Sequence, residues 1–338
     1  MPELVFMEPS IDEMEQHRRH LTGYCYRMLG STFDADDAVQ ETMVRAWRAS
    51  GRFEGRSSLR SWLYRIATNV CLDMLRGKQR RALPMDLSAP VPATTPPGRM
   101  LADQNWIQPV PNGDVLSPGA DPAEGAAMRD SIRLAFIAAL QTLPGRQRAV
   151  LILREVLGWH ASEVAELMDT TVPSVNSALQ RARATLSSHD SEALEAGAAT
   201  AEIDNALLAQ YLEAFERYDI DALVSLLHDD ASISMPPYEM WLQGRSDLRR
   251  WYLGFGIECK GSRLIPSEAN SSPAFGQYRP SGPGGRHEPW SIQVLEVSAG
   301  RIVHVHHFLD TALFERFGLP SSLDRLDPPF VPPSARVG

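Results

Sequence analysis

LPGRQRAVLILREVLGWHASEVAELMDTTVPSVNSALQRAR, residues 143–183, has the pattern of three short helices separated by two breaks. Apolar residues recur at helical spacing up to Gly158, which ends the first helix. A second helix is expected at about 161–168, followed by a turn at 169–172. Pro173 suits the first turn of a third helix, where its missing N–H costs nothing. This stretch therefore predicts a helix-turn-helix unit.

The third helix of this unit has one apolar face and one polar face. The apolar face, expected to be buried, consists of Val175, Ala178, Leu179 and Ala182. The outward residues are Ser174, Asn176, Ser177, Gln180, Arg181 and Arg183. Short hydrogen-bonding side chains come first and arginines follow, as a helix that enters the major groove of DNA requires. The alternative is an ordinary helical hairpin with a solvated face.

Two further helices are expected in the N-terminal third. The first, DADDAVQETMVRAW from Asp34, has an apolar stripe of Ala35, Ala38, Val39, Met43, Ala46 and Trp47. Its opposite face is acidic and polar, with Asp36, Asp37, Gln40 and Glu41. The second, SSLRSWLYRIATNVCLDMLR from Ser57, aligns Arg65, Asn69, Asp73 and Arg76 along one side. The basic segment GKQRR, residues 77–81, follows it.

Charge along the chain is uneven. Residues 43–81 hold ten Lys or Arg against Glu54 and Asp73, a local net of +8 in a chain of net −9. Aromatic residues lie among these cations, namely Phe53, Trp62 and Tyr64. Since arginines hold phosphates and aromatic faces receive unstacked bases, this block favours contact with nucleic acid over a merely solvated surface.

Together these segments resemble the two conserved domains of a sigma-70-family RNA polymerase sigma factor of the extracytoplasmic-function (ECF) group, group 4. The resemblance covers about residues 15–83 and 128–188. It implies that the first helix grips core RNA polymerase, the second reads the −10 promoter element, and the helix-turn-helix reads the −35 element. One departure is Asp169, where the family usually has Gly in the tight turn. Asp tolerates a left-handed conformation better than most residues, so the turn is expected to form.

The resemblance also implies site residues by position. The −10 contacts would be Arg65, Asn69, Asp73, Arg76, Lys78, Arg80 and Arg81. The −35 contacts would be the six outward residues of the third helix, and the polymerase contacts would be Asp36, Asp37, Gln40, Glu41 and Trp47. The expected partners are core RNA polymerase and promoter DNA, without a cofactor, a metal or a catalytic residue.

From about Thr200 the pattern changes to helices followed by strands. Four strands are expected at 262–269, 274–279, 286–297 and 301–309. This order predicts an α+β cone with a curved antiparallel sheet, so the fold class is multidomain, with two all-α domains and an α+β domain. With MPPYEMWLQGR and HHFLD, the segment resembles the SnoaL-like group of the nuclear transport factor 2 superfamily.

That superfamily includes small enzymes with a pocket inside the cone, such as polyketide cyclases and ketosteroid isomerases. The candidate pocket residues are Tyr238, Trp241, Glu288, Trp290, His304 and His306. The two histidines could ligate a metal or act as acid and base, but no third ligand stands at diagnostic spacing. We therefore expect no catalysis here and keep a small-molecule ligand as an alternative.

The expected domains are 1–83, 128–189 and 200–320, with a Pro/Gly-rich linker at 84–127 and a loose tail at 321–338. Within the linker, WIQPVP at 106–111 is expected to dock, because a Trp and an Ile are costly to leave in water. The cysteines, Cys25, Cys71 and Cys259, are isolated in the sequence, and no apolar run approaches membrane-spanning length. A cytoplasmic location without membrane contact is expected.

Residues 190–338 carry 12 Lys or Arg and 21 Asp or Glu, so the whole net charge of −9 lies in the C-terminal extension. An acidic domain beside basic DNA-reading surfaces can hold them in a compact form, which predicts contacts among this domain, the linker and the sigma domains. The predicted function is a sigma factor whose promoter-specific activity is modulated by the fused domain. The alternatives are a helix-turn-helix regulator that senses a ligand, and a SnoaL-like enzyme with a DNA-targeting appendage.

Overall fold

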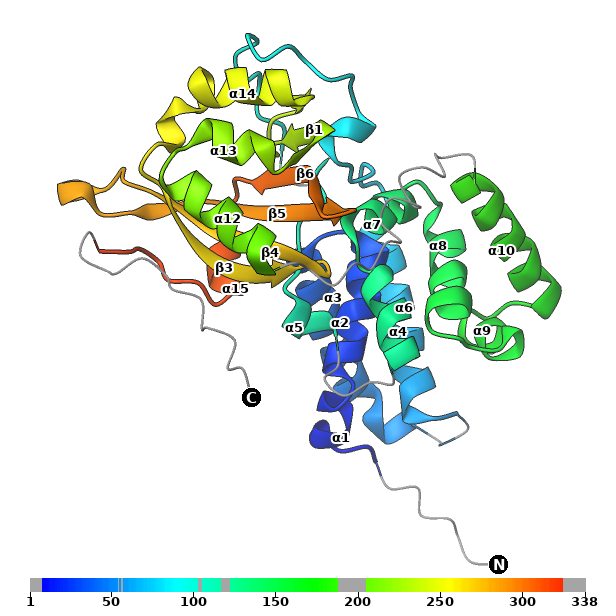
Figure 1. Ribbon diagram of the computed structural model, residues 1–338. Coiled ribbons are helices and arrows are strands. Elements are labelled where there is room, and N and C mark those ends of the chain that lie inside the picture. Colours follow the sequence, from blue (N-terminus) through cyan, green and yellow to red (C-terminus); the bar gives the residue numbers. More distant parts are fainter. Residues whose placement is uncertain are drawn as a thin grey trace, which may run out of the picture. The chain divides into compact units, whose positions relative to one another are not determined.

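The computed structural model describes residues 8–53, 55, 57–102, 105–116, 122–187 and 205–324. The chain forms two compact units (Figure 1). The first contains the residues up to Arg81 and those from Ile107 to the end of the helix-turn-helix, and the second contains Ala82–Trp106 and the C-terminal domain. The predicted tail lies outside the described residues from 325 onward. Within the described part, no helix is both long and apolar enough to cross a membrane.

The N-terminal half of the first unit is a bundle of helices. They are α1 (Ile11–Glu15), α2 (Arg18–Leu29), α3 (Thr32–Ala49), the 3₁₀ turn η1 (Ser50–Arg52) and α4 (Leu59–Leu75). Serine side chains cap the starts of α3 and α4, since Ser31 accepts from the Asp34 amide and Ser58 from the Ser61 amide. The helix predicted from Asp34 thus begins earlier. Gly30 ends α2 in the left-handed conformation, with φ 68°.

The second half of the unit contains the predicted helix-turn-helix. Its helices are α5 (Asn112–Val115), α6 (Pro122–Asp130), α7 (Leu134–Gln141), α8 (Gly145–Leu151) with a π turn η4 (Ile152–Val156), α9 (Ala161–Leu167) and α10 (Val172–Ser187). Asp169 in the turn before α10 has φ 50°, so the left-handed turn forms without glycine, as predicted. Val175, Leu179 and Ala182 are buried, and Ala178 is partly buried.

The second unit is an α+β cone. The chain enters through a 3₁₀ turn, η2 (Pro84–Asp86), and later forms α12 (Asn205–Glu216), α13 (Ile220–Ser225), α14 (Arg245–Leu253), η5 (Phe255–Cys259), η6 (Pro283–Gly285) and α15 (Leu313–Arg316). The strands are β1 (Leu227–Ser234), β2 (Trp241–Gln243), β3 (Arg263–Ala269), β4 (Ser272–Arg279), β5 (Glu288–Ser298) and β6 (Arg301–Phe308). They form one sheet in the order β2-β1-β6-β5-β4-β3.

The sheet is mixed, which corrects the predicted antiparallel sheet. β1 pairs in parallel with β6, with Ile233 opposite Val305, while all other pairs are antiparallel. Hairpin connections join β3 through β6 and dictate antiparallel pairing there. β1 reaches β6 only after a long connection that contains α14, so no hairpin constrains their direction.

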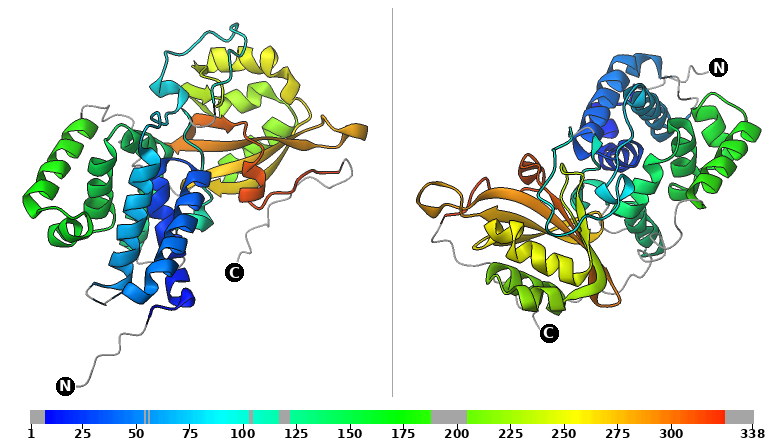
Figure 2. Two further views of the ribbon diagram at one scale, coloured as in Figure 1. Left: turned by 180° about the vertical axis from the view of Figure 1, so that it is seen from behind. Right: turned by 90° about the horizontal axis from the view of Figure 1, so that it is seen from above.

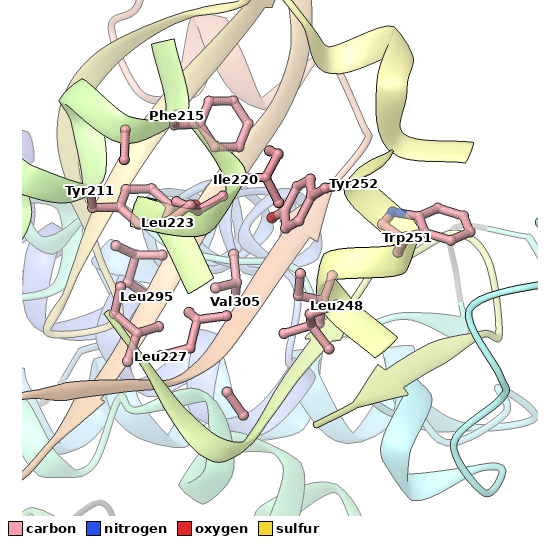
Figure 3. Close-up of a cluster of buried hydrophobic side chains, with 14 of the residues drawn as sticks. Tyr211, Phe215, Ile220, Leu223, Leu227, Leu248, Trp251, Tyr252, Leu295 and Val305 are labelled. Atoms are coloured by element: carbon pink, nitrogen blue, oxygen red, sulfur yellow. The ribbon is translucent and has the colours of Figure 1, made fainter. Parts of the chain in front are cut away.

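The core of the cone lies between the sheet and its helices. α12, α13 and α14 cover one face of the sheet (Figures 1 and 2). Between them pack Tyr211 and Phe215 of α12, Leu248 and Tyr252 of α14, and Val305 of β6 (Figure 3). Because strand side chains alternate between faces, this core defines an inner face of the sheet under the helices and an outer face opposite it.

The first part of the predicted linker belongs to the cone. The Val91 amide donates to the carbonyl oxygen of Trp241 at 2.9 Å, and the Trp241 indole donates to the carbonyl oxygen of Ser88 at 2.8 Å. Ala93, 6 % exposed, belongs to the same hydrophobic core as the helices. The segment around Ser88–Ala93 is therefore part of the cone rather than a plain spacer.

Candidate nucleic-acid interface

Helix α4 presents the predicted −10 residues along one exposed side. Arg65, Asn69, Asp73 and Arg76 are all exposed, while the opposite side buries Leu63, Tyr64, Ala67, Val70 and Cys71. Tyr64 is therefore a core residue and is not free to receive a base, in contrast to the sequence interpretation. Phe53 and Trp62, which are half-buried, pack with ring centroids 5.1 Å apart at the start of the helix.

The basic segment after α4 is partly engaged with α3. Arg81, whose side chain is 9 % exposed, and Lys78 donate to the Asp34 carboxylate at 2.9 and 3.2 Å. Burial works to raise the pKa of Asp34, but the hydrogen bond and charge of Arg81, aided by Lys78, hold it below its usual value. Arg80 is exposed. Of the three predicted −10 contacts in this segment, Arg80 alone has no ion pair among the described residues.

Helix α3 displays the predicted polymerase contacts. Asp36, Asp37 and Gln40 are exposed, and Glu41 pairs with Arg45 at 2.6 Å. Trp47 is 60 % exposed, so its assignment to the buried stripe is wrong. An exposed indole next to an acidic face is typical of a protein-binding anchor, because aromatic residues are enriched at interface centres.

Helix α10 exposes all six predicted −35 residues. Its first turn is capped by Thr171, whose hydroxyl oxygen accepts from the Ser174 amide at 3.3 Å. Arg183 pairs with Glu155 at 2.7 Å, whereas Arg181 has no ion pair among the described residues. Ser174, Asn176, Ser177 and Gln180 complete the exposed face.

The exposed face of α4 and the exposed face of α10 line one cleft, which has a volume of about 690 Å³. Asn69, Asp73 and Arg76 of α4 line it on one side, and Ser174 and Arg181 of α10 line it on the other. Sequence patterns could not predict this arrangement, since α4 ends at Leu75 and α10 begins only at Val172. Residues predicted to bind two separate promoter elements thus surround a common space.

The cleft exists because the two halves of the unit pack together. Arg148 of α8 donates to the carbonyl oxygens of Met28, Gln141 and Leu143, and to the Gln141 side chain. The ring centroids of Tyr64 and Trp159 lie 5.1 Å apart, and the Arg60 guanidinium lies 5.4 Å from the centroid of Trp159. These contacts join α4 to the segment before α9.

A second buried guanidinium reinforces this packing. Arg27 of α2 donates to the Ser131 hydroxyl at 2.6 and 3.0 Å, and both residues are buried. Burial lowers the pKa of Arg27 and that of Arg148 to about 10, so both stay protonated at neutral pH. Neither guanidinium has a carboxylate partner among the described residues, and both donate to carbonyl and hydroxyl oxygens. The Nε of Arg148 is buried without a hydrogen-bond partner.

The later part of the linker docks on the same unit, as predicted. Ile107 and Val110 of this segment are fully buried. Gln108 accepts from the Tyr26 hydroxyl through its carbonyl oxygen and from the Ser31 hydroxyl through its side chain, at 2.9 and 2.5 Å. These contacts hold the linker at the junction between α2 and α3.

The structure does not bring the six candidate pocket residues of the cone together. His304 and His306 lie on the outer face of the sheet. A hydrogen bond of 2.5 Å joins His304 to Ser232, and one of 2.9 Å joins His306 to Ser234. Trp241 faces the linker, Tyr238 pairs with Met100, and Glu288 contacts Ser281 at 3.3 Å. The Arg279 guanidinium covers Trp290, 4.1 Å from its ring centroid. Within the described residues, no group of three or more potential ligands could hold a metal.

The inner face of the cone instead carries a polar network that sequence reasoning missed. The Tyr211 hydroxyl donates to Gln293 at 2.8 Å, and the Gln293 amide donates to Gln277 at 2.9 Å. Ser291 donates to the same Gln277 oxygen, and the Gln277 amide donates to Ser262. His307 lies beside Ser291, and burial lowers its pKa to about 3.

Three family models match the chain: Sigma-70 region 2 at residues 14–81, Sigma-70 region 4 at 133–186, and the SnoaL-like domain at 208–305. Over 317 residues the chain is 45 % identical to the ECF RNA polymerase sigma factor SigG of Mycobacterium tuberculosis, covering 91 % of this chain and 83 % of that protein. The chain belongs to the ECF sigma factors.

Other proteins match nearly the whole length of this ECF sigma factor. A probable ECF RNA polymerase sigma factor of M. tuberculosis, SigI, is 26 % identical over 318 residues, covering 92 % of this chain and 93 % of that protein. The crystal structure of the M. tuberculosis extracytoplasmic function sigma factor SigJ superposes with a TM-score of 0.59 at 21 % identity, covering 92 % and 100 % of the two chains. The latter likeness concerns the fold.

Proposed function

We propose that this ECF sigma factor binds core RNA polymerase through α3, reads the −10 element through α4 and the −35 element through α10, and is modulated by its SnoaL-like domain. The observation that carries the proposal is that all six predicted −35 residues of α10 are exposed, as are the predicted −10 residues Arg65, Asn69, Asp73 and Arg76 at α4. Such a factor acts in the cytoplasm with polymerase. Its mechanism is recruitment and promoter selection.

The packing of the first unit makes it a closed form. Positions −10 and −35 lie about 25 base pairs apart, roughly 85 Å of B-DNA at 3.4 Å per base pair. In the closed form α4 and α10 line one cleft, so they cannot contact both elements at once. Promoter binding therefore requires the two halves of the unit to separate, with the linker extending between them.

The SnoaL-like domain would modulate this step by holding the linker. Hydrogen bonds join Ser88 and Val91 to Trp241, and Ala93 is buried in the core of the cone. A linker held in this way has less length available to extend. Release of residues 82–106 from the cone would lengthen the reach between the two reading helices.

The organisation of the cone supports a regulatory role over catalysis. The polar groups of its inner face, Tyr211, Gln277, Gln293 and Ser291, satisfy one another by hydrogen bonds. If the domain were instead an enzyme, turnover of a small ligand would depend on a polar residue such as His306. A His306→Ala variant tested against polyketide-like and epoxide substrates would distinguish the two.

Run-off transcription with purified core polymerase on a genomic promoter library tests the proposal. Promoter-specific transcripts from the full chain would support it. Ala93→Asp places a charge in the core where the linker docks and should change the transcript yield. The control Arg217→Ala, at an exposed residue just after α12, should leave the yield unchanged. DNA binding without polymerase, as a symmetric dimer, would favour the ligand-sensing regulator instead.

A further inference from the structure

The cleft between α4 and α10 has a composition suited to a ligand. Its volume of about 690 Å³ falls within the range of small-molecule sites, about 300–1,000 Å³. Its walls come from both halves of the first unit. Apolar side chains that include Leu72, Leu75, Val150 and Met168 line it, and polar and charged groups surround them.

The charged groups of the cleft are mostly cationic. Arg76, Arg146 and Arg181 line it together with a single carboxylate, Asp73. Asp73 already interacts with Arg76 at 3.2 Å and with Arg45 at 3.7 Å, while Arg146 donates to a backbone carbonyl. The lining therefore has a net charge of +2, and a positive cleft with low-dielectric walls concentrates anions.

Two of these cations lie on opposite walls. Arg76 follows α4, and Arg181 projects from α10, whose first turn contributes Ser174 to the same lining. Guanidinium groups bind phosphate oxygens in a bidentate manner, and their planar faces also stack on flat rings. A compound that carries phosphate charge on an apolar, planar body satisfies both walls.

We propose that this cleft binds a nucleotide, with its phosphates between Arg76 and Arg181 and its base against the apolar floor. Because the walls come from both halves of the unit, the nucleotide binds the closed form and stabilises it by mass action. It would thereby oppose promoter binding, which uses the same arginines. This regulatory consequence rests on the proposed function, whereas the binding site does not.

Isothermal titration of the full chain with GDP tests the site, with guanosine and inorganic pyrophosphate as partial probes. GDP should bind with one equivalent, and each partial probe should bind at least tenfold more weakly. Arg76→Ala and Arg181→Ala should each weaken GDP binding at least tenfold. Asp73→Asn, which removes the one negative charge, should tighten it about threefold. Arg48→Ala, on the exposed side of α3 and outside the cleft, is the matched control and should leave GDP affinity unchanged.

Several results would overturn the proposal. No saturable GDP binding would remove the site, and equal affinity for pyrophosphate would reduce it to a general anion-binding surface. If only one of the two variants, Arg76→Ala or Arg181→Ala, weakened GDP binding, the ligand would contact one half of the unit and not bridge both. Equal weakening by Arg48→Ala would indicate non-specific attraction. Run-off transcription tests the regulatory role separately from the nucleotide site. If GDP bound as expected but did not lower the transcript yield, the regulatory role alone would be overturned.

Discussion

Arg148 on α8 donates a hydrogen bond to the carbonyl oxygen of Met28, one residue before the end of α2. A cation from one half of the first unit thus caps the C-terminal end of a helix in the other half, where the helix dipole is negative. Gln141 assists by donating to the carbonyl oxygen of Arg27 at 3.4 Å. The closed form is therefore held by a helix cap that spans the two sigma regions.

Replacement of Arg148 by Met should destabilise the closed form by about 1–3 kcal/mol, because the carbonyl oxygens of Met28, Gln141 and Leu143 lose their donor while buried. Urea unfolding followed by circular dichroism measures this change. Arg18→Met is the matched control, since Arg18 is an exposed residue of α2 paired with Glu15, and its loss should cost under about 1 kcal/mol. Equal effects of the two would contradict the capping role.

Arg181→Ala should weaken binding to a −35 duplex by about 1–3 kcal/mol if the guanidinium contacts a base edge. Arg181 is exposed on α10 and has no ion pair among the described residues, so the fold should be unaffected. Fluorescence anisotropy at fixed salt measures the change. Arg217→Ala in the cone serves as the control. An unchanged affinity on every responsive promoter would refute the assigned recognition face.

Trp47→Ala should weaken binding to core polymerase by about 2 kcal/mol, or roughly thirtyfold, if the indole is an interface anchor. Its side chain is 60 % exposed, so stability should change little. Changing Asp36 and Asp37 together to Lys should weaken binding further. Biolayer interferometry with immobilised core enzyme measures both effects. The exposed Leu253 provides a control, and Leu253→Ala should bind like the parent.

The stability of the cone should fall as the pH drops below about 6.5, the ordinary pKa of histidine. Burial lowers the pKa of His307 to about 3, so between these values the unfolded chain binds a proton that the folded cone does not. The loss should be about 1.6 kcal/mol between pH 6.5 and 5. Unfolding midpoints of the parent and of His307→Gln, compared across this range, measure it.

The matched control for this pH dependence is His228→Gln, because His228 is an exposed residue of β1. It should keep the pH profile of the parent, whereas His307→Gln should make that profile shallower; a smaller acid loss remains because burial also lowers the pKa of His304. A His307→Gln protein that loses stability with acid as steeply as the parent would assign the effect to other groups.

Local patterns in the sequence predicted the helices of the first unit well. The spacing of Val175, Leu179 and Ala182 identifies the buried side of α10, and a single residue, Asp169, sufficed to predict a left-handed turn. Such features depend on neighbours a few residues away. Trp47 was misassigned for the same reason, because periodicity places it at the edge of a buried stripe and cannot show how far the neighbouring helices extend.

Features that depend on distant pairs could not be predicted. The Gln277–Gln293 hydrogen bond needs the register of β4 on β5, and a shift by one residue would turn each side chain to the other face. The placement of His304 and His306 on the outer face also follows from register. The shared cleft and the docking of Ala93 require contacts between segments about a hundred residues or more apart.

The attachment of the linker to the cone also has a consequence in time. Ser88 and Trp241 are 153 residues apart, and a ribosome adds about 5–20 residues per second. For roughly 8–30 seconds during synthesis, the linker has therefore left the ribosome while the strand that binds it does not yet exist. Each newly made chain passes through a period in which the promoter-reading half is complete and its restraint has not been translated.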